Sequence, residues 1–169
     1  MTDPKKILVA IDDFRQSERL INYVAALARG SSHFYLHLFH AAGPLPPNLL
    51  ESTGAEDPVE EIRVEQKQER AQDRWVIKVK AETQRLFDAH KAQLVAAQFP
   101  EVNIFTHFVL LNQRGDFIPE IIKAAHQNNC GTIVVGHESY GWIREQFHTH
   151  VSEQLISESP GVAVCVVSK

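Results

Sequence analysis

The sequence predicts an α/β fold, a three-layer, doubly wound, five-stranded parallel sheet with about four helices. Strand-like apolar runs alternate along the chain with segments whose apolar residues recur at helical spacing. The strand-like runs are nearly uninterrupted, which is typical of strands buried on both faces of a parallel sheet. The chain has 169 residues, 44% of them hydrophobic, which is enough for one sizeable core. We therefore expect a single domain over residues 1–169.

Five segments are predicted to be strands. Each is a short apolar run, rich in β-branched or aromatic residues and followed by polar residues, Gly or Pro. In chain order they cover residues 6–11, 33–42, 102–111, 132–136 and 162–167.

Four segments are predicted to be helices. The first lies within residues 17–30, with Ser17 as its N-cap and Gly30 as its stop. The second covers about 78–98, the third begins near Asp116, and the fourth follows Thr149.

A charged stretch separates the second predicted strand from the second helix. It follows the segment GPLPP, which no regular element can cross, and we expect residues 43–80 to form a variable insertion. Residues 56–75 either extend the second helix away from the body of the protein or form a mobile excursion. A solvated charged face explains this stretch, and a protein-partner site over residues 50–80 is the alternative.

Composition excludes several classes of function. A net charge of −4 and an isoelectric point near 6.1 give no electrostatic basis for binding nucleic acid or an anionic membrane. The apolar runs are too short to span a bilayer, and we expect a cytoplasmic protein. The two cysteines, Cys130 and Cys165, are distant in sequence, and we expect both to be reduced and buried.

Ligands of doubly wound sheets bind beyond the carboxyl ends of the strands, where the strand order reverses. In this chain, Asp12, residues 41–43 and the loop after Gly136 follow the predicted strands. We expect a ligand site at this edge of the sheet.

Three segments resemble the universal stress protein family. ILVAIDDFRQSERLINYVAALA is similar to the opening strand, aspartate and first helix of that family. LLNQRGDFIPEIIKAAHQNNCGTIVVG resembles its Gly-Asp turn, helix and glycine-ended strand, and VSEQLISESPGVAVCVV is similar to its closing helix and strand. The resemblance implies a fold of the adenine-nucleotide alpha-hydrolase type and a regulatory, non-enzymatic role in stress.

The resemblance also implies a candidate nucleotide site. Its members are the residues that match the nucleotide-binding edge of the family: Ala10, Ile11, Asp12, Ala41, Val135, Gly136, Ser139, Thr149, His150, Val151 and Ser152. In the ATP-binding branch, Asp12 would contact the nucleoside. The alternative for Asp12 is a turn-forming or capping residue, which any strand end in this fold can use.

The phosphate-binding motif of that branch is degraded in this chain. The motif has Gly, two residues, Gly, nine residues, Gly and then Ser or Thr, and only Gly136 matches it. Ser139 and Thr149 replace the second and third glycines, and His150 replaces the hydroxyl residue. Glycine lets backbone N–H groups approach phosphate oxygens without interference from a Cβ atom. We therefore predict that this loop no longer binds the phosphates of ATP. The alternative is a switch that still binds ATP or AMP.

Two other chemistries compete for the same loop. The segment HESYG resembles a nucleophile elbow at Ser139, but Glu145 and His148 or His150 would have to complete the triad within one loop. His137, His148 and His150 lack a convincing ligand spacing, so we predict no metal site. Trp142, Ile143 and Phe147 are expected to cover the sheet or pack against a partner subunit.

The last predicted strand would leave an apolar sheet edge if it stood alone. Family members are usually dimers joined near this strand, so the resemblance implies a homodimer. Its predicted centre is the run Val162, Ala163, Val164, Cys165, Val166 and Val167. We expect no certain cofactor, and ATP or another adenine nucleotide is the alternative.

Overall fold

The computed structural model contains the predicted five-stranded parallel sheet, with strand order β3-β2-β1-β4-β5. The structure describes residues 2–12, 14–29, 31–50, 57–136 and 151–168. The strands follow the predicted ones closely: β1 Asp3–Ala10, β2 Tyr35–Ala42, β3 Ile104–Leu110, β4 Cys130–Gly136 and β5 Ala163–Val167. The predicted fold class is confirmed.

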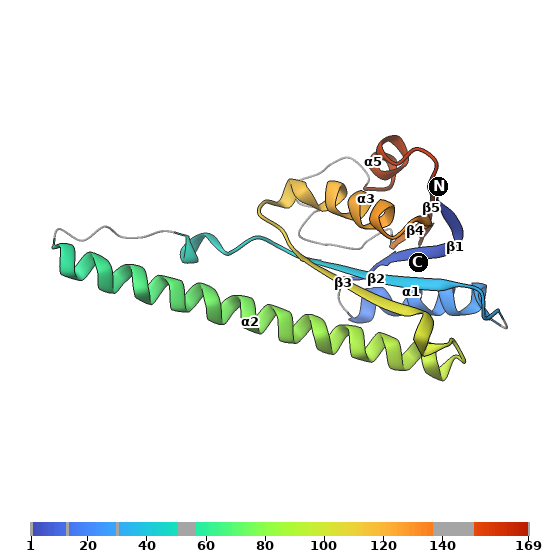
Figure 1. Ribbon diagram of the computed structural model, residues 1–169, viewed down its shortest axis with the longest axis horizontal. Coiled ribbons are helices and arrows are strands. Elements are labelled where there is room, and N and C mark those ends of the chain that lie inside the picture. Colours follow the sequence, from blue (N-terminus) through green and yellow to red (C-terminus); the bar gives the residue numbers. More distant parts are fainter. Residues whose placement is uncertain (1, 13, 30, 51–56, 137–150, 169) are drawn as a thin grey trace.

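Four α-helices in the described part of the chain cover the two faces of the sheet (Figure 1). Helices α1 (Phe14–Leu27) and α2 (Pro58–Ala96) lie on one face. Helices α3 (Phe117–Gln127) and α5 (Val151–Glu158) lie on the other. Short 3-10 turns at Pro47–Leu49, Glu101–Asn103 and Arg114–Asp116 complete the connections.

The central strand β1 contributes side chains to both cores. Ile7, Val9 and Ile11 pack with residues of α1 and α2. Leu8 and Ala10, which point to the opposite face, pack with residues of α3 and α5. All five are at most 1% exposed, which explains why residues 7–11 are an uninterrupted apolar run.

Helix α2 begins twenty residues earlier than the predicted start at 78, at Pro58. The charged stretch before residue 78 is therefore a helical extension of α2, which was one of the two predicted alternatives. Asp57 caps the helix, because its Oδ1 accepts the Val59 N–H at 3.1 Å, and Pro58 suits the first helical position.

Only the C-terminal half of α2 is anchored in the core. With 39 residues, α2 is about 58 Å long, and its buried side chains all lie between Thr83 and Leu94. The N-terminal half extends beyond the sheet in Figure 1. Among the described residues, no helix is long and apolar enough to cross a membrane, α2 included.

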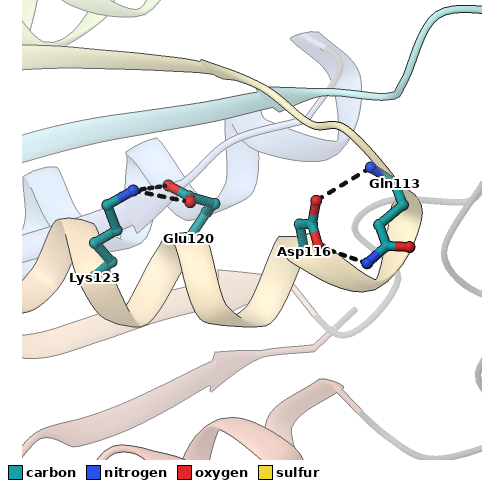
Figure 2. Close-up of polar contacts among 4 residues, drawn as sticks. All are labelled: Gln113, Asp116, Glu120 and Lys123. Carbon is teal, nitrogen blue, oxygen red and sulfur yellow. Dashed lines mark hydrogen bonds and ion pairs between the residues drawn. The ribbon is translucent and has the colours of Figure 1, made fainter.

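A capping box in the 3-10 turn Arg114–Asp116 leads directly into helix α3 (Figure 2). The Asp116 carboxylate accepts the Gln113 backbone N–H and the Gln113 side-chain amide, each at 3.1 Å. Lys123 and Glu120 form an ion pair at 3.0 Å on the exposed side of the helix. The prediction that Asp116 lies near the start of this helix is therefore confirmed.

The predicted start of the first helix was wrong. Helix α1 begins at Phe14, so Ser17 lies inside its first turn and is 1% exposed. Ser17 Oγ accepts the N–H of Asp12, which precedes the helix. Gly30, the predicted stop, lies outside the described residues, and α1 ends at Leu27.

Cys130 is buried as predicted, but Cys165 is only half-buried, because β5 is an edge strand.

Two histidines join β2 to the edge strand β3. His37 Nδ1 and His107 Nε2 form a hydrogen bond of 2.8 Å, and the His37 ring also stacks on Phe105 at 4.9 Å between ring centroids. His37 is 6% exposed. Burial, aided by the nearby His107 and Lys6, lowers the pKa of His37 to about 4, so its imidazole is neutral at pH 7.

We predict that acidification destabilises the protein through His37. The unfolded chain takes up a proton near pH 6.5, whereas the folded His37 resists it until about pH 4. The free energy of unfolding should therefore fall as the pH drops from 6.5 to 4, by on the order of 2–3 kcal/mol from this group. Urea titrations of the wild type and of His37→Phe measure this loss. The variant keeps the ring stack and should show a shallower pH dependence in that window; identical pH dependences would contradict the assignment.

Candidate functional site

The candidate site lies where the strand order reverses, at the carboxyl ends of β1, β2 and β4. The chain passes from β1 to β2 and β3 on one side of the sheet, then to β4 and β5 on the other. Val9 pairs with Val134, so the end of β1 lies beside Val135 and Gly136. Such a switch point is the usual ligand position in this architecture.

Three hydrogen bonds fix the corner that follows β1. The Ile11 N–H donates to the Phe39 carbonyl at 2.8 Å. The Asp12 N–H donates to Ser17 Oγ at 2.8 Å, and His40 Nδ1 bonds the Ile11 carbonyl at 2.9 Å. The backbone that carries Asp12 is thus held by β2 on one side and by α1 on the other.

His40 belongs to this corner, although it was not among the predicted site residues. A carbonyl oxygen can only accept, so Nδ1 of His40 carries the proton and donates it to Ile11. Burial lowers the pKa of His40, and this effect is opposed by the hydrogen bond to Ile11 and by the negative charge of Asp12. In the neutral ring Nε2 is therefore an acceptor. The signal was present in the sequence, because His40 directly precedes the predicted residue Ala41 at the end of β2.

The predicted site residues differ in how deeply they are buried. Four apolar ones are buried, Ala10, Ala41 and Val135 in the core under α3 and α5 and Ile11 in the core under α1 and α2. Asp12 and Gly136 are half-buried, and Val151 is half-buried at the start of α5. Ser152 follows it in α5, while Ser139, Thr149 and His150 lie outside the described residues.

The described groups favour a ligand that donates hydrogen bonds. The Asp12 carboxylate and the neutral His40 imidazole both present acceptors next to the same corner. Amino groups and sugar hydroxyls are donors of this kind. Within the described ranges, no three His, Cys, Asp or Glu side chains are grouped to hold a metal ion.

The rival chemistries of the loop concern residues that the structure does not describe. The nucleophile candidate Ser139 and its partners Glu145, His148 and His150 lie in the range 137–150, as does the metal candidate His137. The apolar loop residues Trp142, Ile143 and Phe147 lie there too.

Comparison with known proteins agrees with the fold. A model of the universal stress protein family matches residues 4–167. No curated protein matches the chain.

Solved structures share the fold at low sequence identity. A universal stress family protein from Burkholderia pseudomallei is 18% identical, with a TM-score of 0.64 over 97% of this chain and 96% of its own. The universal stress protein from Archaeoglobus fulgidus in complex with dAMP is 15% identical, with a TM-score of 0.54 over 95% of each chain. A universal stress protein in complex with cAMP is 14% identical, with a TM-score of 0.60 over 96% of this chain and 95% of its own.

We predict that Ser17→Ala destabilises the Asp12 corner. The substitution removes the acceptor of the Asp12 N–H inside a packed site, which should lower the free energy of unfolding by about 1–2 kcal/mol. Urea denaturation measures the loss. Ser157→Ala is the matched control, because Ser157 is exposed and its hydroxyl donates only to the Gln154 carbonyl of its own helix. Equal effects of the two substitutions would mean that the Ser17 hydroxyl does not hold the corner.

Proposed function

Because the chain belongs to the universal stress protein family, we propose that it is a non-enzymatic regulatory protein that retains a nucleoside-binding corner and has lost the phosphate grip. The observation that carries the proposal is the hydrogen-bonded corner at Asp12. Its three hydrogen bonds join the turn after β1 to β2 and α1. The altered motif residues Ser139, Thr149 and His150 are not among the residues that form these three bonds.

The altered loop residues weaken binding of the phosphates. A non-glycine residue in the left-handed backbone region costs about 1–2 kcal/mol, and Ser139 and Thr149 replace two of the motif glycines. Together they would lower the affinity for a nucleotide by about thirtyfold to nearly a thousandfold. Thr149 is β-branched and is the less suitable of the two for such a position.

A nucleotide switch is the second candidate. The complexes of related proteins with dAMP and cAMP favour it, because both ligands combine an adenine nucleoside with a single phosphate. The nucleoside would occupy the same Asp12 corner in both candidates. They differ in whether the phosphate contributes to affinity.

We also propose a homodimer through β5. This strand is an edge of the sheet with β4 as its only neighbour in the described structure, and Val166 is 38% exposed. An unpaired apolar edge favours association with another strand. In a dimer, the run from Val162 to Val167 would be covered by its own copy.

Helix α2 offers a surface for a protein partner. Ile62 and Ile77 are each more than half exposed in the half of the helix that extends beyond the sheet. One side of that half is occupied by the chain itself, because Gln68 and Gln72 donate to the Leu49 carbonyl at 3.0 and 2.7 Å. The remaining side supports the proposal of a partner site within residues 50–80.

We predict that the wild-type protein binds adenosine and ATP with similar, weak affinity. Protein purified without added nucleotide should release no stoichiometric ATP, ADP or AMP on denaturation, as measured by mass spectrometry. The triple variant Ser139→Gly, Thr149→Gly, His150→Ser restores the motif and should bind ATP at least about tenfold more tightly than adenosine, because phosphate contacts are added.

Asp12→Ala in the restored variant is the control, and it should weaken binding of both ligands. Stoichiometric ATP from the wild-type protein would contradict the loss of the phosphate grip and would establish the nucleotide switch. If the restored variant still binds ATP weakly while its affinity for adenosine is unchanged, the restored loop does not contact the phosphates.

We predict that Val166→Glu converts the dimer to a monomer. A carboxylate in the centre of a paired apolar edge would be buried without a partner, which opposes association. Light scattering at micromolar concentration measures the mass. Ile156→Glu on α5, where the side chain is 62% exposed, is the control and should leave the dimer intact. A monomeric wild-type protein would refute the proposed dimer.

A further inference from the structure

A cavity lies at the opposite end of the strands from Asp12. Its volume is about 520 Å³, and it is formed by the starts of β1, β2 and β3 together with the turn that follows α3. The residues used below that line it are Asp3, Lys6, Tyr35, His37, Phe105 and Asn129. Lys6 pairs with Tyr35 across β1 and β2, and His37 pairs with Phe105 across β2 and β3, so these four side chains are neighbours on the sheet.

The cavity contains one cation and one carboxylate that do not neutralise each other. No carboxylate among the described residues lies within ion-pair distance of the Lys6 ammonium. Asp3 Oδ1 accepts the Lys5 backbone N–H at 2.9 Å, which orients the carboxylate without cancelling its charge. Asp3 and Lys6 are both half-buried, so their charges are screened less than those of fully exposed groups.

A buried polar atom in the cavity wall also lacks a partner. His37 is 6% exposed, and its Nδ1 is engaged by His107, which does not line the cavity. His37 Nε2, on the ring edge that faces away from His107, makes no hydrogen bond. Burying such a nitrogen without a partner is unfavourable, and a ligand in the cavity could satisfy it after a small side-chain adjustment.

The backbone of this region is fixed. The Asp3 N–H donates to the Asn129 carbonyl at 2.8 Å. The chain at Asp3 and Pro4 passes so close to Gly131 that a Cβ atom there would lie 2.7 Å from the Asp3 carbonyl oxygen. Only glycine permits this approach, and Asn129 adopts a left-handed φ of 56°, which asparagine tolerates. The carboxylate of Asp3 is therefore carried by a rigid segment.

We propose that this cavity binds a small zwitterion, namely a free α-amino acid with an apolar or aromatic side chain. Its carboxylate would pair with Lys6 and its ammonium with Asp3. The ammonium is also favoured by the carbonyl end of α3, which carries partial negative charge. The partly exposed rings of Tyr35 and Phe105 would cover the ligand side chain, and His37 Nε2 would gain a hydrogen-bond partner.

The pair of charges favours a zwitterion over a simple ion. A simple anion would gain from Lys6 but be repelled by Asp3 and by the end of α3, and a simple cation would be attracted by Asp3 but repelled by Lys6. A molecule that carries both charges a few bonds apart meets both groups with the correct sign. The volume lies within the range of small-molecule sites, which is about 300–1,000 Å³.

The test is an NMR titration of the full chain with three probes of one shape. L-Phenylalanine has both charges, phenethylamine lacks the carboxylate, and 3-phenylpropanoate lacks the ammonium. L-Phenylalanine should shift the amide resonances of the cavity residues, and each single-charge probe should bind at least about tenfold more weakly, because one charged hydrogen bond is lost.

Two substitutions and a matched control locate the binding. Lys6→Gln and Asp3→Asn should each weaken L-phenylalanine binding by about tenfold, and Asp3→Asn keeps an acceptor for the Lys5 N–H. Lys5→Gln, next to Lys6 but exposed and outside the cavity, should change nothing. Absence of binding, equal binding of the three probes, equal effects of Lys5→Gln and Lys6→Gln, or shifts confined to the Asp12 corner would each overturn the proposal.

Discussion

The structure depends on the complete burial of residues 7–11, which form the second half of β1 and the position after it. This strand has hydrogen-bonded neighbours on both sides, β2 and β4, and its side chains alternate between two separate cores. Each core buries one face of the sheet under a pair of helices (Figure 1). A polar or larger side chain anywhere from Ile7 to Ile11 would disturb a core at the centre of the sheet, where no shift of an edge strand can relieve it.

The same constraint places the nearest charged residues on either side of this buried run. Because no polar side chain fits within the buried run, Asp12 and Lys6 are the nearest positions on either side that can carry charge. Asp12 lies at the switch point, and Lys6 lies at the cavity beyond the other end of the strands. The two candidate sites therefore share the strands β1 and β2 but lie at opposite ends of them.

Much of the fold was predictable because its signals are local. Buried parallel strands appear as uninterrupted apolar runs, and helix α3 has an apolar face with an acidic residue at its start. The start of α1 was wrong for a physical reason: a serine near a helix start suits an N-cap, but it serves equally well as a buried acceptor for the preceding turn. Sequence alone does not distinguish these two uses of Ser17. The single domain, the cytoplasmic location and the dimer remain predictions.

The polar contacts of both sites were less predictable because their partners are distant in the sequence. His40 and Ile11 are 29 residues apart, and His37 and His107 are 70 residues apart. Their pairing follows from strand register, which is defined only once the sheet is assembled. Asp12 was identified because it follows the first strand directly, whereas no local pattern connects Lys6, Asp3 and the turn after α3.

The corner at Asp12 and the glycine motif are far apart in the sequence. The hydrogen bonds that hold Ile11 and Asp12 come from Phe39, His40 and Ser17, all of which belong to β2 or α1. Ser139 and Thr149, which replace the motif glycines, take no part in these three bonds. A chain can therefore lose the glycines that suit phosphate and still present Asp12 and His40 to a ligand that donates hydrogen bonds.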